Sequence, residues 1–224
     1  PITPFTPREL SVRGIERQIR AFIRCAVLAR EAGYDGVEIM GSEGYFINEF
    51  LVSYTNRRTD EWGGSYENRM RLPLEIVRRV REAVGRDFII IYRLSMIDLI
   101  PGGSTWDEVV QLAKGIEKSG GADLIICGEE SADGATGQVP AGLAEWLNIS
   151  QLTLLTEINL DLERRVATGR RSLKGGYEIL EAPLPCLVSA KTAGNEPRFM
   201  DFRRKAWAYE PEHVTIWNAA DMKV

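Results

Sequence analysis

The sequence predicts an α/β fold with a mainly parallel sheet, and three observations carry this prediction. Helical and strand-like stretches alternate through the first half of the chain, which is typical of right-handed βαβ units. Two strand-like stretches, 88–94 and 123–127, are near-continuous apolar runs, as expected of strands buried on both faces. The 224 residues suffice for one large or two small packed domains, at roughly 100–200 residues per domain.

Three helices are expected in the first half of the chain. Apolar residues recur at helical spacing over 14–32, and Gly33 ends that helix. An amphipathic helix covers 66–84, where Pro73 predicts a kink or a late start because proline clashes with the preceding helical turn. A third helix covers 105–119.

Strands are expected between these helices. The short run GVEIM at 36–40 is the first strand, and a long loop over 41–65, rich in Gly, Asn, Asp and Ser, follows it. Together with 88–94 and 123–127 it gives three strands that helices connect, which is the arrangement of a parallel sheet.

The second half of the chain has a different pattern. A helix is expected over 137–147, and polar and apolar residues then alternate over 151–182 with glycine turn signals, which predicts an antiparallel ribbon. A buried strand is expected over 184–190 and one short helix over 195–206. The character of the sequence changes near 120–128, which is the expected boundary between two regions.

The composition excludes several classes of function. Lys and Arg number 28 against 32 Asp and Glu, and the net charge of −4 leaves no basic excess for a nucleic acid. No run of about 18 apolar residues occurs, so no membrane span is expected. The amino terminus, PITPFTPREL, has neither a signal-peptide pattern nor a starting Met, so we expect a piece of a longer gene product.

Cysteine and histidine usage indicates a reducing, cytoplasmic compartment and no metal chemistry. Three widely spaced cysteines without a C-x-x-C pair exclude a zinc ribbon or an iron–sulfur cluster within these residues, and we expect buried thiols. The single histidine, His213, argues against His-rich metal ligation and against a Ser-His-Asp triad. The cysteines are Cys25, Cys127 and Cys186.

Ligands of parallel α/β proteins collect at the carboxyl ends of the strands, so the residues directly after each strand are candidates. Tyr45 follows the strand at 36–40 and could donate a proton through its phenol, or pack under the loop. Arg93 ends an apolar strand, where an arginine is costly unless it meets an anion or a polar ligand. A buried ion pair of Arg93 with Glu38 or Asp98 is the open alternative.

A third candidate follows the strand at 123–127. The segment DGATGQ at 133–138 is a Gly-rich turn that leads into a helix, and free backbone N–H groups at a helix start suit a phosphate. A Gly-rich turn with a Thr cap is also a common structural feature. The adjacent carboxylates Glu129 and Glu130 are expected in a solvated loop rather than in a glycosidase pair.

Four stretches of the first half carry a family resemblance: AGYDGVEIMGSEGY at 32–45, INEFL at 47–51, TNRRTDEWGGSYENRMR at 55–71 and DFIIIYRLSMIDL at 87–99. Through them, residues 1–122 resemble the 2,4-dienoyl-CoA reductase branch of the old yellow enzyme family, whose members are TIM barrels that hold FMN. The resemblance implies a partial TIM barrel here, because only about four βα units are present.

The same resemblance implies roles for individual residues. Tyr45 corresponds to the proton donor to the substrate carbon, and Arg93 to a residue against the flavin ring. Met40 and Glu43 stand at cofactor positions where many relatives carry histidine or asparagine, and Met40 favours the dienoyl-CoA branch over simple enone reductases. The implied reductant is NAD(P)H, and the implied substrate is an acyl-CoA or an enone.

Three stretches of the second half carry a different resemblance: ADLIICGEESADGATGQVPAGLAEWL at 122–147, PLPCLVSAKTAGNEPRF at 183–199 and VTIWNAADMKV at 214–224. They resemble the beta subunit of electron transfer flavoproteins. The resemblance implies a partial doubly wound nucleotide-binding domain with an antiparallel ribbon.

This second resemblance implies a nucleotide site and a docking loop. The phosphates of AMP or of an FAD are expected at Asp133, Thr136, Gly137 and Gln138. A redox partner flavoprotein is expected at Gly194, Asn195, Glu196, Pro197 and Arg198. Many relatives have a leucine where Gly194 stands.

We therefore expect a partial FMN-oxidoreductase region at 1–122 and a partial electron transfer flavoprotein beta-like region at 123–224. The expected function is that of a flavin-dependent oxidoreductase. The alternatives are an electron-transfer or nucleotide-binding module without its own catalysis, or a non-functional hybrid fragment.

Three origins stay open for such a chain: an artificial or recombination-derived chimera, a sequence-assembly artefact, or a natural fusion of a reductase piece with an electron-carrier piece. Half a barrel leaves sheet edges and apolar faces exposed, which favours the first two. An open sheet across the joint is a further expectation, because both regions share βαβ geometry.

Overall fold

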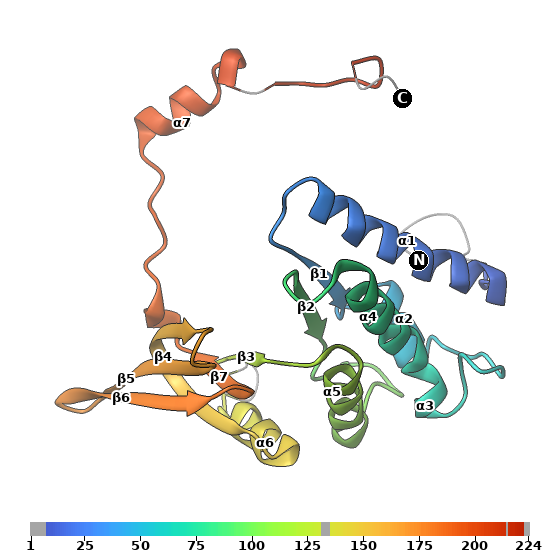
Figure 1. Ribbon diagram of the computed structural model, residues 1–224, viewed down its shortest axis with the longest axis horizontal. Coiled ribbons are helices and arrows are strands. Elements are labelled where there is room, and N and C mark those ends of the chain that lie inside the picture. The colour runs from blue at the N-terminus through green and yellow to red at the C-terminus, as the bar shows by residue number, and fades with distance from the viewer. Residues whose placement is uncertain (1–7, 131–134, 214, 222–224) are drawn as a thin grey trace.

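The computed structural model describes residues 8–130, 135–213 and 215–221, and its helices and strands follow one another as Figure 1 shows. The helices are α1 (Val12–Glu31), α2 (Phe46–Leu51), α3 (Tyr66–Arg69), α4 (Arg71–Val84), α5 (Trp106–Gly120), α6 (Gln138–Leu147) and α7 (Phe202–Ala208), with 3-10 turns η1 (Thr192–Gly194) and η2 (Pro211–His213). The strands are β1 (Gly36–Gly41), β2 (Ile89–Leu94), β3 (Leu124–Gly128), β4 (Ser150–Asp161), β5 (Val166–Leu173), β6 (Gly176–Pro183) and β7 (Cys186–Ala190). The mixed α/β class predicted from the sequence is confirmed.

The strands β1 and β2 form a two-stranded parallel sheet. Their register places Gly36 opposite Ile89 and Met40 opposite Arg93, so both carboxyl ends lie at one edge. Helices α1 and α4 pack against each other, and their apolar faces join the strands in one core. The fully buried residues of that core include Ile15, Ile19, Ile47, Leu72 and Ile76.

Local sequence signals set the ends of the helices. Ser11 caps α1, because its hydroxyl accepts a hydrogen bond from the backbone N–H of Gly14 at 3.1 Å. The helix predicted over 66–84 is divided at Met70 into α3 and α4. Pro73 is the third residue of α4, where its missing N–H costs no intrahelical hydrogen bond, so the late start is confirmed.

The second sheet has five strands in the order β3-β7-β4-β5-β6. The first three are parallel to one another, and β4, β5 and β6 are antiparallel, which confirms the ribbon predicted over 151–182. The buried strand predicted over 184–190 is also confirmed, because Cys186, Leu187 and Val188 of β7 are fully buried. Helix α6 packs against β4 and β7.

The two sheets remain separate at the predicted boundary. Within the described residues, β3 forms a parallel ladder with β7 along its whole length and none with β2, so the open sheet expected across the joint does not form. The helices do continue past the joint, since α5 packs against both α4 and α6 (Figure 1).

Two predicted burials are wrong. The strand at 88–94 is not buried on both faces: Ile89 and Ile91 of β2 are 55% and 52% exposed, whereas Ile90 and Tyr92 pack into the core. The strand at 123–127 likewise exposes Ile126. The physical reason is that the helices cover a single face of the two-stranded sheet.

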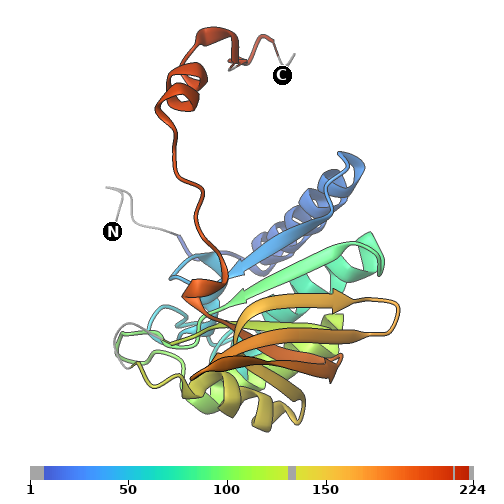
Figure 2. The ribbon, with the colours of Figure 1, turned by 90° about the vertical axis from the view of Figure 1, so that its left-hand side faces the viewer.

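The carboxyl-terminal segment forms an arm that leaves the body of the molecule (Figures 1 and 2). The helix predicted over 195–206 is wrong in its first half, because α7 begins only at Phe202, after an extended stretch. Pro197 lies in that stretch, and a proline disfavours helical backbone in the residue before it. The aromatic side chains Phe199 and Phe202 of the arm are 99% and 87% exposed.

In residues 8–130, 135–213 and 215–221, no helix has the length and apolar character needed to cross a membrane. The three cysteines are free thiols, as expected, but the prediction that all are buried is wrong. Cys186 is buried and Cys127 is half-buried, whereas Cys25 is exposed because it lies on the outward face of α1.

Candidate functional site

The predicted catalytic and cofactor residues of the first half meet at the edge where β1 and β2 end. One loop joins β1 to α2 over 42–45, and another joins β2 to α5 over 95–105. Because the strands are parallel, both loops leave the sheet at the same edge. We call this edge the strand-end site; it is formed by Met40, Glu43, Tyr45 and Arg93.

Arg93 is held by carboxylates. Its Nε donates to Glu38 Oε1 at 2.6 Å and its Nη2 to Glu38 Oε2 at 3.3 Å, while Glu43 Oε1 lies 3.9 Å from Nη1. The hydrogen bond from Arg93 lowers the pKa of the Glu38 carboxyl below its ordinary value. The predicted alternative of an ion pair with Glu38 is confirmed, but the pair is half-exposed rather than buried.

Tyr45 stands at the start of α2. It occupies the N-cap position in extended conformation, and its residue is 60% exposed, so it does not pack under the loop. The turn before it contains two residues in the left-handed region, Glu43 with φ 64° and Gly44 with φ 75°. Ser42 closes the turn toward the sheet, because its hydroxyl donates to the sulfur of Met40 at 3.4 Å.

One polar residue at this edge, Asn48, was not singled out from the sequence, and it bonds Asp98. Asn48 of α2 is buried, and its side chain bonds both Gly44 and Asp98. Asp98 therefore contacts Asn48 rather than Arg93, so the second predicted pairing of Arg93 is not formed. The one signal in the sequence is an asparagine inside the apolar run INEFL, where a polar side chain must find partners.

The predicted nucleotide turn is only partly described, and Asp133 lies outside the described residues. Gly137 is the N-cap of α6 with φ 61°, in the left-handed region that glycine adopts readily. Thr136 and Gln138 on either side of it are exposed. The start of α6 therefore faces solvent, as a phosphate-binding helix start must.

The loop after β3 is tied to the end of β7. Glu129 lies 3.1 Å from the ammonium group of Lys191, so this carboxylate belongs to an ion pair. Glu130 is exposed, as expected of a solvated loop, whereas Glu129 is half-buried.

The predicted docking loop begins the carboxyl-terminal arm. Gly194 ends η1, and all five predicted residues of the loop, Gly194, Asn195, Glu196, Pro197 and Arg198, are exposed. Gly194 and Asn195 line a shallow groove of about 440 Å³ beside β4. A side chain at position 194 would come within 3.0 Å of the backbone oxygen of Thr156, so only glycine fits there without a shift.

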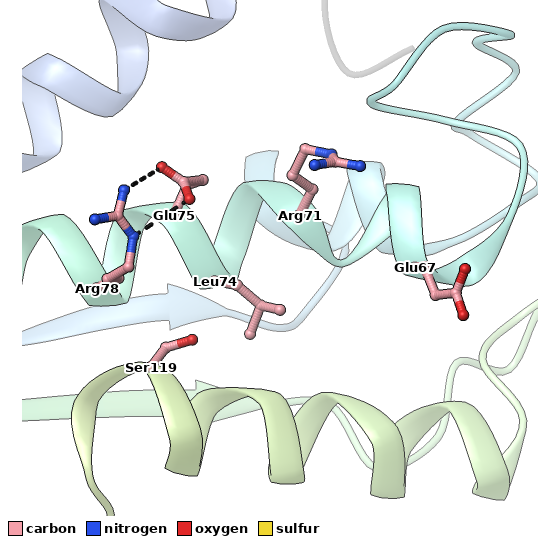
Figure 3. Close-up of a pocket in the computed structure, with 6 residues that line it drawn as sticks. All are labelled: Glu67, Arg71, Leu74, Glu75, Arg78 and Ser119. Atoms are coloured by element: carbon pink, nitrogen blue, oxygen red, sulfur yellow. Dashed lines mark hydrogen bonds and ion pairs between the residues drawn. The ribbon is translucent and has the colours of Figure 1, made fainter.

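A second hollow lies between α4 and α5, away from the strand-end site. Figure 3 shows its lining residues, among which Arg78 is bonded to Glu75. Its volume is about 280 Å³, and two of its charged groups, Arg78 and Glu75, are paired with each other on α4. The lining residues are Glu67, Arg71, Leu74, Glu75, Arg78 and Ser119.

The single histidine belongs to the arm. His213 stacks on Trp207 with ring centroids 3.9 Å apart, and its Nε2 lies 3.1 Å from a carboxylate oxygen of Glu210. With Glu212 it forms an exposed group of three candidate ligands. Exposed acidic groups of this kind are common without a metal ion.

Two family models match the chain and overlap near its middle. The model of the NADH:flavin oxidoreductase / NADH oxidase family matches residues 2–141, and the electron transfer flavoprotein domain matches residues 98–221.

Curated relatives match parts of the chain. An NADH oxidase from Thermoanaerobacter brockii is 48% identical over 114 residues, which are 51% of this chain and 18% of that protein. A metal reductase from Desulforamulus reducens is 40% identical over 149 residues, 65% of this chain and 22% of that protein. The chain thus spans about a fifth of the length of these relatives.

Solved structures also resemble the chain. A 2-naphthoyl-CoA reductase in complex with 2-naphthoyl-CoA aligns at a TM-score of 0.52 and 41% identity, covering 55% of this chain and 19% of that one. An old yellow enzyme homologue from Zymomonas mobilis aligns at a TM-score of 0.53 and 30% identity, covering 64% of this chain and 42% of that one.

Proposed function

This chain belongs to the NADH:flavin oxidoreductase / NADH oxidase family through residues 2–141 and to the electron transfer flavoprotein domain family through residues 98–221, and on that premise we propose that it is part of an FMN-dependent oxidoreductase. Residues 1–122 are the partial TIM-barrel region that carries the reductase site, and residues 123–224 are a partial nucleotide-binding region. NAD(P)H is the reductant.

The observation that carries this proposal is the gathering of Tyr45, Arg93, Met40 and Glu43 at one strand-end edge. Two segments about fifty residues apart place a phenol, a guanidinium and a carboxylate there, because β1 and β2 run parallel and end together. In parallel α/β proteins this is the edge at which reacting groups collect.

The residues of β2 fit the ring system of a flavin. Every second residue of β2 lies on its exposed face, namely Ile89, Ile91 and Arg93. This face is therefore an apolar surface with a guanidinium group at its carboxyl end. A planar aromatic ring can lie on such a surface while the guanidinium donates hydrogen bonds to its polar edge. Arg93 would thus hold the ring, and Met40 on the neighbouring strand would border it.

Hydride transfer to an activated C=C bond is the chemistry that FMN supplies when it is bound. The protein must then deliver a proton to the other carbon of that bond, and Tyr45 carries the exposed hydroxyl that serves as this proton donor. Glu38 holds the guanidinium of Arg93 in place through its two hydrogen bonds. Substrate binding on the exposed face would exclude water from the donor.

The substrate class is an acyl-CoA with a conjugated C=C bond, of the dienoyl-CoA type, or a simple enone. One of the similar solved structures is a 2-naphthoyl-CoA reductase in complex with 2-naphthoyl-CoA. This similarity supports an acyl-CoA thioester as the substrate. Met40, in place of a histidine, supports the dienoyl-CoA branch.

The second region supports a separate role as a nucleotide-binding and electron-transfer module. The exposed start of α6, at Thr136, Gly137 and Gln138, suits a phosphate of AMP or FAD. The exposed loop over 194–198 suits contact with a redox partner flavoprotein.

Changing Tyr45→Phe tests the reductase proposal. We expect turnover of an enoyl-CoA substrate to fall roughly 100-fold, because a positioned proton donor contributes at least that much, while reduction of the flavin by NAD(P)H stays unchanged. Stopped-flow measurement of the two half-reactions separates these steps.

Tyr34→Phe is the matched control for this experiment. Tyr34 is exposed as Tyr45 is, but it precedes β1 and so lies at the opposite end of that strand. Unchanged enoyl-CoA turnover in Tyr45→Phe, or an equal loss in Tyr34→Phe, would remove Tyr45 from the mechanism.

A further inference from the structure

A chain of hydrogen bonds joins the two loops of the strand-end site. The backbone N–H of Gly44 donates to Asn48 Oδ1 at 2.7 Å, and Asn48 Nδ2 donates to Asp98 Oδ1 at 3.2 Å. Gly44 directly precedes Tyr45, whereas Asp98 lies in the loop that follows Arg93. One buried amide therefore connects the loop that carries the phenol to the loop that carries the guanidinium.

Asp98 is itself fixed at three points. Besides Asn48, it accepts a hydrogen bond from the hydroxyl of Ser95 and another from the backbone N–H of Ser104, both at 3.2 Å. Ser104 comes directly before Thr105, the N-cap of α5. The carboxylate thus anchors both ends of its own loop before it meets Asn48.

The orientation of the Asn48 amide is dictated by its partners. A backbone N–H can only donate, so the amide oxygen faces Gly44; an ionised carboxylate can only accept, so the amide nitrogen faces Asp98. Asn48 is only 3% exposed, so water does not substitute freely for either partner. An aspartate in its place would set two carboxylates against each other.

The turn that is held in this way is conformationally costly. Glu43 has φ 64°, in the left-handed region where a side chain costs roughly 1 kcal/mol, and Gly44 follows at φ 75°. Such a turn needs outside contacts to persist, and the bond from Gly44 to Asn48 is the shortest one that its backbone makes to a side chain.

We propose that Asn48 and Asp98 are positioning residues, which hold the turn before Tyr45 in a fixed place relative to the strand end that carries Arg93. The inference rests on the proposed function for the roles of Tyr45 and Arg93. The bridge itself is a property of this chain without any ligand, so it can be tested separately.

The first test is the exchange of backbone amide hydrogens in the purified chain, measured by NMR or mass spectrometry. In Asn48→Asp the amide of Gly44 should exchange roughly tenfold faster at pH 7, because repulsion between the carboxylates at positions 48 and 98 displaces the acceptor of the Gly44 N–H. The double variant Asn48→Asp/Asp98→Asn should restore slow exchange. The swapped pair keeps one donor facing one acceptor, and the new amide oxygen at position 98 can still accept from Ser104.

Asn68→Asp is the matched control. Asn68 also lies near a helix start, but its amide donates to the backbone oxygens of Asp60 and Gly63 in a different loop. It should speed exchange in residues 60–64 and leave Gly44 unchanged.

If Asn48→Asp does not fold, Asp98→Ala removes the acceptor without adding a charge and should speed exchange at Gly44 and Ser104.

The second test uses the flavin-loaded chain. Asn48→Asp should lower enoyl-CoA turnover roughly tenfold and leave flavin reduction by NAD(P)H unchanged, and the double variant should recover turnover. If Asn48 only supported the fold, exchanging the amide and the carboxylate between positions 48 and 98 would not restore turnover.

The two tests separate failure of the inference from failure of the proposed function. Unchanged exchange at Gly44 in Asn48→Asp, or no recovery in the double variant, overturns the bridge whether or not flavin binds. Normal turnover in Asn48→Asp despite faster exchange overturns its positioning role. A chain that binds no flavin but shows the expected exchange contradicts the proposed function alone.

Discussion

At the scale of single residues, Arg93 shows what a sequence can and cannot reveal. An arginine at the end of an apolar strand had to meet an anion or a polar ligand, and the structure supplies Glu38 at 2.6 Å. Which carboxylate it meets could not be predicted from spacing. Glu38 lies in one expected strand and Asp98 in the loop after the other, and either could face Arg93. The parallel register of β1 and β2 settles the choice.

The roles of Asn48 and Asp98 were beyond the sequence for a related reason. The apolar run INEFL indicates that Asn48 needs a partner but not which one, and its bond to Asp98 joins positions that are 50 residues apart. Tyr45 and Arg93 were found because their motifs resemble a family, whereas a bridge between loops exists only once the strands have paired.

The pairing of Arg58 with Asp60 makes stability depend on pH. Both nitrogens of the Arg58 side chain that face Asp60 donate to it, one of them at 2.9 Å, and these bonds lower the pKa of Asp60 below its ordinary value of 3.8. A lowered pKa in the folded state means that the stabilisation is present above the ordinary value. It is lost as the pH falls through the lower, folded value.

Asp60→Asn should therefore destabilise the chain at pH 7 by about 1 kcal/mol, a figure kept small because Asp60 is 36% exposed. The difference from the unsubstituted chain should shrink toward zero at an acidic pH below the lowered, folded pKa of Asp60, where the native carboxylate is also protonated. Urea unfolding at both pH values measures this, with the exposed Asp87→Asn as control. An equal difference at the two pH values would contradict the ion pair.

At the scale of elements, α5 begins with a complete capping box. The N–H of Glu108 donates to the hydroxyl of Thr105 at 3.3 Å, and the N–H of Thr105 donates to the Glu108 carboxylate at 2.9 Å. The other oxygen of Glu108 meets Arg69, whose side chain is 8% exposed. The start of α5 therefore fixes the end of the loop that carries Asp98.

Thr105→Ala should lower the free energy of unfolding by about 1 kcal/mol, because one helix-end N–H loses its acceptor. Ser65→Ala should cost less, since Ser65 caps the four-residue helix α3 through a longer bond of 3.4 Å. Urea unfolding compares the two variants. A larger loss in Ser65→Ala would contradict the role given to the capping box.

The positions of most elements could be predicted from apolar periodicity and glycine or proline signals, but their burial could not. The apolar run at 88–94 has the pattern of a strand covered on both faces, yet helices cover one face only. Burial depends on which other segments reach the strand, and periodicity within one segment does not contain that information. The helix predicted over 195–206 starts only at Phe202, because the prediction took no account of the restriction that Pro197 places on the backbone before it.

At the scale of the whole molecule, the change of character near 120–128 could be predicted, but its structural form could not. Strand β3 could have joined either region, and it forms its ladder with β7. Within the described residues, β1 and β2 pair only with each other, and Ile89 and Ile91 leave one face of their sheet exposed.

Titration of the purified chain with FMN, followed by the visible absorbance of the flavin, tests the flavin site most directly. We expect saturable binding that Arg93→Ala weakens roughly tenfold, the loss of one charged hydrogen bond, and that Arg164→Ala leaves unchanged. Arg164 is a comparably exposed arginine that pairs with Glu181 on the other sheet. No saturable binding, or equal weakening by both substitutions, would contradict a flavin site at the ends of β1 and β2.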